Sequence, residues 1–153
     1  MAKHTSISSE EAADRLAIRE LVEDYARCAD QRDAKGQMAL FIPDAYFVVY
    51  MNARDPTPSR EIHSREELVE VFADLKMYTA TMHFLGQTTI LTLANERGTA
   101  ETYCMPHHYI AGKNQGLMIA ALRYADTFVK MDGAWLFAER RLYVDWLEQR
   151  ELP

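Results

Sequence analysis

The order of the hydrophobic patterns along the chain is the feature that most constrains its fold. Apolar residues recur with spacings of three and four between Ile18 and Ala29, which predicts an amphipathic helix from Ser9 to Cys28. Shorter helices are predicted over 33–41, with Asp33 as N-cap, and over 65–75. After His83 the chain consists of strand-like segments separated by turns. Helices followed by consecutive hairpins predict an α+β fold with a mostly antiparallel sheet.

Runs of β-branched and aromatic residues predict the strands of this sheet. The pair Asp132 and Gly133 is a strong signal for a hairpin turn, and Pro106 removes a backbone donor, which bends or bulges its strand. A curved antiparallel sheet wrapped around the N-terminal helices forms a cone with an internal pocket. The predicted strands are 46–51, 87–93, 99–110, 117–130 and 134–146.

The chain length of 153 residues, with 48% hydrophobic and 26% charged residues, is typical of one globular domain. We expect this domain to span 9–147, between a flexible tail at 1–8 and a C-terminal tail at 148–153. No apolar run reaches the ~20 residues of a membrane helix, and the N-terminus lacks the apolar stretch of a secretory signal. These features predict a cytoplasmic protein in which Cys28 and Cys104 are reduced.

The formal net charge of −6 argues against nucleic acid as a partner, because nucleic-acid binding needs a basic patch. The sequence has no Gly-rich phosphate loop and no G-x-S-x-G motif, which argues against nucleotide use and serine hydrolysis. Eight Met and eight Tyr residues are a mild excess, and such side chains line adaptable apolar cavities as well as ordinary cores. The expected partner is therefore a small apolar or aromatic molecule, without membrane binding.

Asp30 and His83 are the candidate catalytic pair. Singly, each has an ordinary alternative: Asp30 as a solvated residue at a helix end, and His83 as a core side chain among apolar neighbours. Together they form a general base, because a carboxylate that bonds one imidazole nitrogen fixes the tautomer and makes the other nitrogen a better proton acceptor. Such a pair needs neither a metal nor a cofactor.

Two tyrosines and one histidine are candidates for binding substrate. Tyr25 lies on the apolar stripe of the first helix and Tyr50 on an apolar strand, where each can either aim a hydroxyl into a cavity or pack in the core. His107 and His108 are consecutive on a strand, so only one faces inward. Parity with Cys104 favours His108, and Cys104 itself is expected to be a small apolar filler.

Two further interpretations concern charged and metal-ligating residues. His83, one of the two later histidines and a carboxylate are a conceivable metal set, but no compact motif such as H-E-x-x-H supports it, and the metal-free interpretation is preferred. Arg123 is kept as a pocket candidate. The ordinary explanation for the charged residues of the last two strands is cross-strand pairing on a solvated face; these residues are Arg123, Asp126, Glu139 and Arg141.

Six short segments carry a family resemblance: AIREL at 17–21, YARCAD at 25–30, FIPDA at 41–45, MHFLG at 82–86, RYAD at 123–126 and DGAW at 132–135. Through them the chain from Ala13 to Trp146 resembles the SnoaL-like branch of the nuclear-transport-factor-two superfamily, which has a cystatin-like fold. The resemblance implies an α+β cone with an internal pocket, and self-association as a dimer or trimer through the outer sheet face.

Enzymes of this family include scytalone dehydratase, bile-acid 7α-dehydratase and hexachlorocyclohexane dehydrochlorinase. They use an Asp at the end of the first helix with a His before the central strands, and Asp30 and His83 fall at those positions. Tyr25 and Tyr50 fall where the dehydratases place pocket tyrosines, and His107 or His108 falls near a second histidine of scytalone dehydratase.

These observations favour a cofactor-independent lyase, such as a dehydratase, that acts on a small apolar or aromatic oxygenated substrate. An isomerase or cyclase that uses the same base on polyketide or steroid-like substrates is one alternative. A second alternative is a non-catalytic protein of the same fold that binds a small molecule or serves as a subunit.

Overall fold

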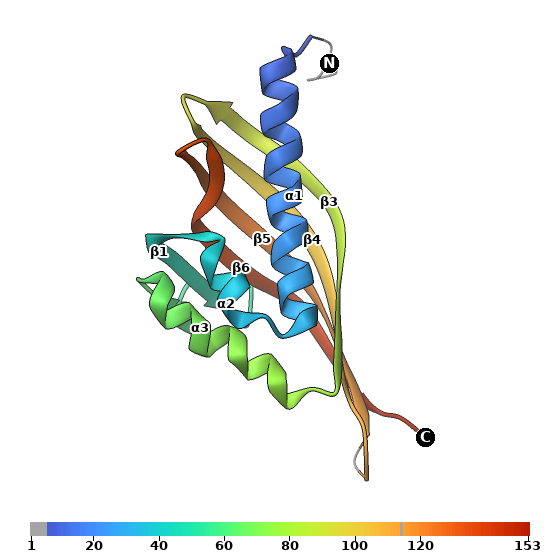
Figure 1. Cartoon of the computed structure of the whole chain (residues 1–153). Helices are drawn as coiled ribbons and strands as arrows, with labels where there is room; N and C mark the ends of the chain where they lie inside the picture. The colour runs from blue at the N-terminus through green and yellow to red at the C-terminus, as the bar shows by residue number, and fades with distance from the viewer. Residues whose placement is uncertain (1–5, 114) are drawn as a thin grey trace.

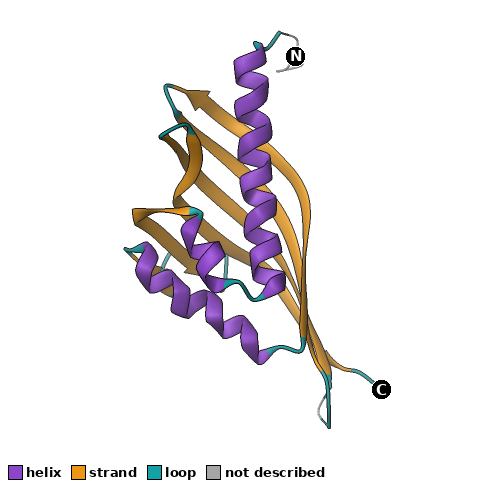
Figure 2. Cartoon of the chain, viewed as in Figure 1, coloured by secondary structure: helices purple, strands orange, loops and turns teal. Residues whose placement is uncertain are grey.

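Three helices cover the concave face of one curved six-stranded sheet (Figures 1 and 2). The computed structural model describes residues 6–113 and 115–153. The predicted tail over 1–8 therefore lies mostly outside the described residues. In chain order the elements are α1 (Ser9–Gln31), α2 (Ala34–Ala39), β1 (Phe41–Tyr50), β2 (Arg60–Ile62), α3 (Arg65–Ala73), the 3₁₀ helix η1 (Asp74–Met77), β3 (Ala80–Ala94), β4 (Arg97–Ile110), β5 (Gly116–Met131) and β6 (Ala134–Glu151).

The sheet has the strand order β2-β1-β6-β5-β4-β3. The four long strands β3 to β6 form successive antiparallel hairpins, whereas β1 pairs with β6 in parallel. The predicted α+β fold with a mostly antiparallel curved sheet is thus confirmed. Several boundaries differ from the prediction. β1 begins at Phe41 rather than at 46, and α2 ends at Ala39 rather than at 41. β3 begins at Ala80, before His83, and β6 continues to Glu151, where it pairs with Gly116. The segment 148–151 is therefore strand rather than tail.

Helix α1 begins and ends at identifiable caps. The Ser8 hydroxyl accepts a hydrogen bond from the Glu11 amide at 3.0 Å, which satisfies one of the free donors of the first turn. At the other end, Arg32 has a left-handed φ of 62°, and its amide bonds the carbonyl of Ala29. The Asp33 amide bonds the carbonyl of Cys28, which completes a Schellman motif. This end of α1 lies against β3, at the edge of the sheet.

The core is an aromatic cluster that holds one buried ion pair. Arg140 is fully buried, and its guanidinium donates to the Asp126 carboxylate at 2.7 and 2.8 Å. The same group lies over the rings of Tyr25, Tyr124 and Phe137 at 4.0 to 4.3 Å. The prediction that Asp126 belongs to a solvated face is wrong. Its strand position shares the inner face with Tyr124, where Arg140 reaches it from the neighbouring strand.

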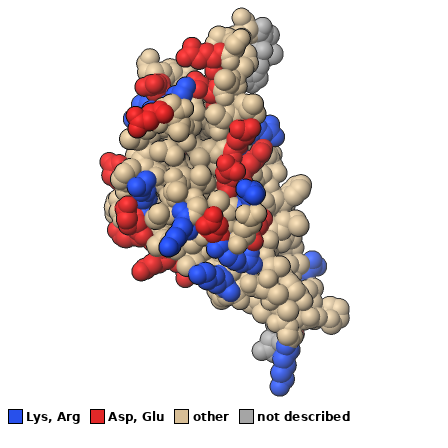
Figure 3. All heavy atoms as spheres, in the orientation of Figure 1, with Lys and Arg blue, Asp and Glu red and all other residues tan. Residues whose placement is uncertain are grey.

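The helix-bearing face of the molecule carries acidic and basic side chains interspersed with one another (Figure 3). At the lower end of Figure 1 the strands extend beyond the helices, and in Figure 3 the surface there is mostly uncharged. Within residues 6–113 and 115–153, no helix is long and apolar enough to cross a membrane.

Candidate active site

Asp30 and His83 meet where the end of α1 reaches the edge strand β3. Asp30 Oδ1 lies 2.7 Å from His83 Nδ1, and the side chain of His83 is only 8% exposed. A carboxylate can only accept hydrogen bonds, so the short contact assigns the proton to Nδ1. Nε2 then keeps its lone pair and faces away from Asp30. This is the tautomer that a general base requires.

The position of β3 at the sheet edge explains why Asp30 lies there. The His83 backbone N–H has no neighbouring strand to bond, and it donates instead to both Asp30 oxygens at 3.1 and 3.0 Å. The hydroxyl of Thr81, two residues earlier on the same face, donates to Asp30 Oδ1 at 3.0 Å. The Asp30 carboxylate therefore accepts the hydrogen bond of a free backbone N–H at the sheet edge and also orients the His83 ring.

These donors also set the protonation state of Asp30. Burial raises the pKa of Asp30, but the hydrogen bonds from the ring and backbone N–H of His83 and from Thr81 outweigh burial and hold the pKa below its ordinary value of 3.8. Asp30 is consequently an anion at neutral pH, and it can stabilise the imidazolium that forms when His83 takes up a proton.

His108 lies beside His83 on the inner face of β4, as its parity predicts. The two ring centroids are 5.5 Å apart. Burial, followed by the nearby His83 and Arg32, lowers the pKa of His108 from 6.5 to about 4, so its ring is neutral at pH 7. Both of its ring nitrogens are buried and lack a hydrogen-bond partner among the described residues. His107 faces the other way, with Nδ1 at 3.0 Å from the Met105 carbonyl.

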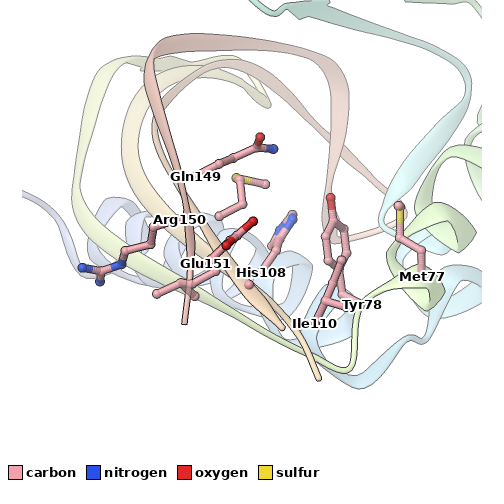
Figure 4. A pocket seen from close by; sticks show the side chains of 10 residues that line it. Met77, Tyr78, His108, Ile110, Gln149, Arg150 and Glu151 are labelled. Atoms are coloured by element: carbon pink, nitrogen blue, oxygen red, sulfur yellow. The ribbon is translucent and has the colours of Figure 1, made fainter. Parts of the chain in front are cut away.

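A pocket of about 440 Å³ opens on the His108 side of the site (Figure 4). Tyr78, which follows η1, lies against His108 with ring centroids 4.4 Å apart. The opposite wall comes from the ends of β5 and β6, with Met118 and Gln149. The pocket wall is thus largely apolar, and its polar groups include the neutral imidazole of His108 and the side chains of Gln149, Arg150 and Glu151.

Three predicted binding residues lie away from this pocket. Tyr50 is on the outer face of the sheet, where its ring stacks on Tyr143 at 4.7 Å. Arg123 is also on that face, and it forms a two-pronged ion pair with Asp145 at 2.7 and 2.8 Å. Tyr25 is 5% exposed and packs in the aromatic core. The pocket positions predicted for Tyr50 and Arg123 are therefore wrong, and Tyr25 follows its alternative, core packing.

The family can be assigned once this geometry is known. Residues 10–141 match the model of the SnoaL-like domain. The chain belongs to the SnoaL-like domain family. An uncharacterized relative, Rv2910c of Mycobacterium tuberculosis, is 27% identical over 134 residues, which cover 88% of this chain and 87% of that protein. The resemblance drawn from the six short segments is thereby confirmed.

Solved structures share this SnoaL-like fold over nearly the whole chain. A proposed scytalone dehydratase from Novosphingobium aromaticivorans superposes with a TM-score of 0.78 at 19% identity, covering 96% of this chain and 94% of that one. A hexachlorocyclohexane dehydrochlorinase, LinA type 2, gives a TM-score of 0.76 at 15% identity, covering 94% and 91%. At these identities the likeness establishes the fold alone.

Sequence reasoning missed three residues of this SnoaL-like site. Thr81 could have been found, because it shares strand parity with His83. Tyr78 and Arg32 carry no comparable signal, since Tyr78 ends a 3₁₀ turn and Arg32 follows a helix. Cys104 is buried below the site, and burial raises the pKa of its thiol to about 11, which keeps it protonated. Cys104 is thus the inert filler that the sequence predicts.

The metal alternative has no ligand set in the part of the chain that the structure describes. Across residues 6–113 and 115–153, no group of three or more His, Cys, Asp or Glu side chains is arranged to hold a metal ion.

Proposed function

We propose that this protein is a cofactor-independent lyase of the dehydratase type, with His83 as its general base. The observation that carries the proposal is the 2.7 Å contact between Asp30 Oδ1 and His83 Nδ1, which leaves Nε2 as a free proton acceptor. A well-placed general base contributes about 10²–10⁴-fold to a rate. His83 packs against His108, which lines the pocket of about 440 Å³, and this neighbour supports a catalytic role over a structural one.

The proposed reaction is the loss of water from a β-hydroxy ketone. His83 Nε2 removes a proton from the carbon next to the carbonyl, and Asp30 stabilises the resulting imidazolium. The neutral His108 donates its N–H to the carbonyl oxygen, on which negative charge develops. The carbon–oxygen bond then breaks, and the hydroxide takes the proton from His83 to leave as water. No net proton is gained or lost.

The pocket supports a particular class of substrate. Its volume of about 440 Å³ and its Met77 and Met118 walls fit a small apolar or aromatic molecule with one or two oxygens. The shared fold with proteins described as a dehydratase and a dehydrochlorinase also supports an elimination, since both names denote the loss of a small molecule from the substrate.

A suitable test is the dehydration of 4-hydroxy-4-phenylbutan-2-one, whose enone product absorbs in the near ultraviolet. We expect His83→Ala to lose about 10²–10⁴-fold in rate, and Asp30→Asn to lose at least tenfold. Arg19→Ala, on the exposed side of α1, is the matched control. Equal rates in the wild type and both site variants contradict the proposal. A product of unchanged mass indicates an isomerase, and a raised melting temperature without conversion indicates a binding protein.

A further inference from the structure

Arg32 connects the two halves of the candidate site. Its Nη1 group donates to the Thr81 hydroxyl at 2.8 Å and to the Asp30 backbone carbonyl at 2.7 Å. Its Nη2 group donates to the Tyr78 carbonyl at 3.3 Å. Thr81 bonds the Asp30 carboxylate, and Tyr78 packs on His108. One guanidinium therefore joins the Asp30 side of the site to the pocket side.

The contact with Thr81 fixes the direction of a hydroxyl proton. Arginine has donors and no acceptors, so Thr81 Oγ1 must accept the hydrogen bond from Arg32. The single proton of that hydroxyl is then left for Asp30 Oδ1, 3.0 Å away. Asp30 Oδ1 also contacts Nδ1 of the His83 ring. Arg32 therefore acts on His83 through two intervening side chains.

The backbone of Arg32 gives an independent reason to look for a role of its side chain. Arg32 holds the left-handed position after α1, with a φ of 62°. Glycine is the residue most often found there, because any Cβ atom strains this conformation. Glycine would therefore suit the backbone of this turn better than arginine does. What it adds is the three hydrogen bonds of its guanidinium.

We propose that Arg32 is a positioning residue: its guanidinium orients the Thr81 hydroxyl and thereby the Asp30 carboxylate that holds His83. The proposal rests on the proposed function, because it assigns Arg32 a part in the action of the same base. Arg32 does not line the pocket on the His108 side, and its guanidinium is bonded to Thr81 and to the backbone carbonyls of Asp30 and Tyr78. Its effect therefore falls on the chemical step rather than on binding.

The kinetic test uses Arg32→Gly, Thr81→Val and the double variant in the dehydration of 4-hydroxy-4-phenylbutan-2-one. Glycine suits the backbone at position 32, so the helix end is kept while the guanidinium is removed. We expect kcat of each single variant to fall roughly tenfold, the loss that one hydrogen bond to a charged group carries. KM should stay within about twofold, and the double variant should be no more than about threefold slower than Arg32→Gly.

Three kinetic results overturn the proposal: an unchanged kcat in Arg32→Gly, a rise in KM without a fall in kcat, or losses that multiply fully in the double variant. Arg19→Ala, which removes an exposed guanidinium from α1, the helix that Arg32 follows, is expected to match the wild type.

A second readout does not depend on catalysis. The His83 amide is bonded to the Asp30 carboxylate, so its hydrogen exchange reports how firmly Asp30 is held. We expect this amide to exchange about tenfold faster in Arg32→Gly and in Thr81→Val, relative to the Thr102 amide inside the sheet. An unchanged ratio overturns the proposal. If the wild type dehydrates no ketone, the proposed function fails, and the exchange ratio still decides the role of Arg32.

Discussion

Replacing His108 by phenylalanine is expected to stabilise the protein while it impairs catalysis. The two ring nitrogens of His108 are buried without a hydrogen-bond partner among the described residues. Phenylalanine keeps an aromatic ring against Tyr78, 4.4 Å away, and the adjoining pocket offers room for its larger ring. The substitution therefore removes two buried nitrogens that lack hydrogen bonds, and it opens no cavity in the core.

The magnitude follows from the cost of burying an unpaired polar group, about 1–3 kcal/mol. His108 is only partly buried as a residue, so we take the lower half of that range and expect a gain of about 1–2 kcal/mol at pH 7. For a chain of this size, a gain of 1 kcal/mol corresponds to a rise of about 2–4 °C in melting temperature. Dehydration should slow, because no N–H is left to bond the carbonyl oxygen.

The gain should grow in acid. The pKa of His108 is about 4 in the folded protein, against an ordinary value of 6.5. Between these values the unfolded chain binds more protons than the folded one, so the wild type loses stability as the pH falls from 7 toward 4. Full linkage gives ~2 kcal/mol between pH 7 and pH 5, and allowance for solvent screening of the partly exposed ring leaves about 1 kcal/mol. The phenylalanine variant lacks this loss.

Urea denaturation at pH 7 and pH 5 measures both effects. His108→Leu also lacks the nitrogens but differs in shape, so a gain shared by the two variants is attributable to the nitrogens. His107→Phe on the opposite face is the matched control, and it should not show the gain in stability at pH 7. A loss of stability in His108→Phe and His108→Leu at both pH values refutes the reasoning, because it means that the imidazole is satisfied in the folded protein.

Three other predictions follow from the structure. Arg140→Met leaves the Asp126 carboxylate buried and unpaired, so the free energy of unfolding measured in urea should fall by about 3–5 kcal/mol. Adding Asp126→Leu should recover most of this loss, and a loss below about 1 kcal/mol in Arg140→Met contradicts the prediction. Tyr50 and Arg123 lie on the outer face, so Tyr50→Phe and Arg123→Met should dehydrate the ketone within about twofold of the wild-type rate. A roughly tenfold lower rate in either variant would mean that the residue takes part in the site. Self-association remains a prediction, and light scattering should give the mass of a dimer or trimer. Phe84→Asp introduces a charge at an exposed apolar residue of the outer face and should lower this mass. A monomer mass at all protein concentrations contradicts the prediction.

The fold was largely predictable because its signals are local. The stripe from Ile18 to Ala29 and the Ser8 cap define α1, and the turn at Asp132 and Gly133 defines the last hairpin. The ends of β3 and β6 were not predictable, because they pair at the open ends of long hairpins, far from the turns: His83 pairs with Pro106, and Glu151 pairs with Gly116. The short strand β2 depends likewise on its pairing with β1.

The candidate site was predictable only in part. Strand parity correctly placed His108 inward, since its strand has one clearly buried face. The pocket position of Tyr50 was wrong, because β1 is apolar on both faces: Phe47 lies in the core while Tyr50 and Val48 share the outer side. The solvated face predicted for Asp126 was also wrong, because Asp126 lies on the inner face and is compensated by a buried arginine from another strand. Pairings of this kind are set by tertiary packing and leave no local pattern.

The central claim is that His83, oriented by Asp30, removes a proton from carbon. The most direct test is deuterium exchange into the carbon next to the carbonyl of 4-phenylbutan-2-one in D₂O, followed by NMR. This ketone has no leaving group, so the measurement isolates the base step. The account predicts exchange by the wild type, a loss of about 10²–10⁴-fold in His83→Gln, and an intermediate rate in Asp30→Asn. Equal exchange by the wild type and His83→Gln would contradict it.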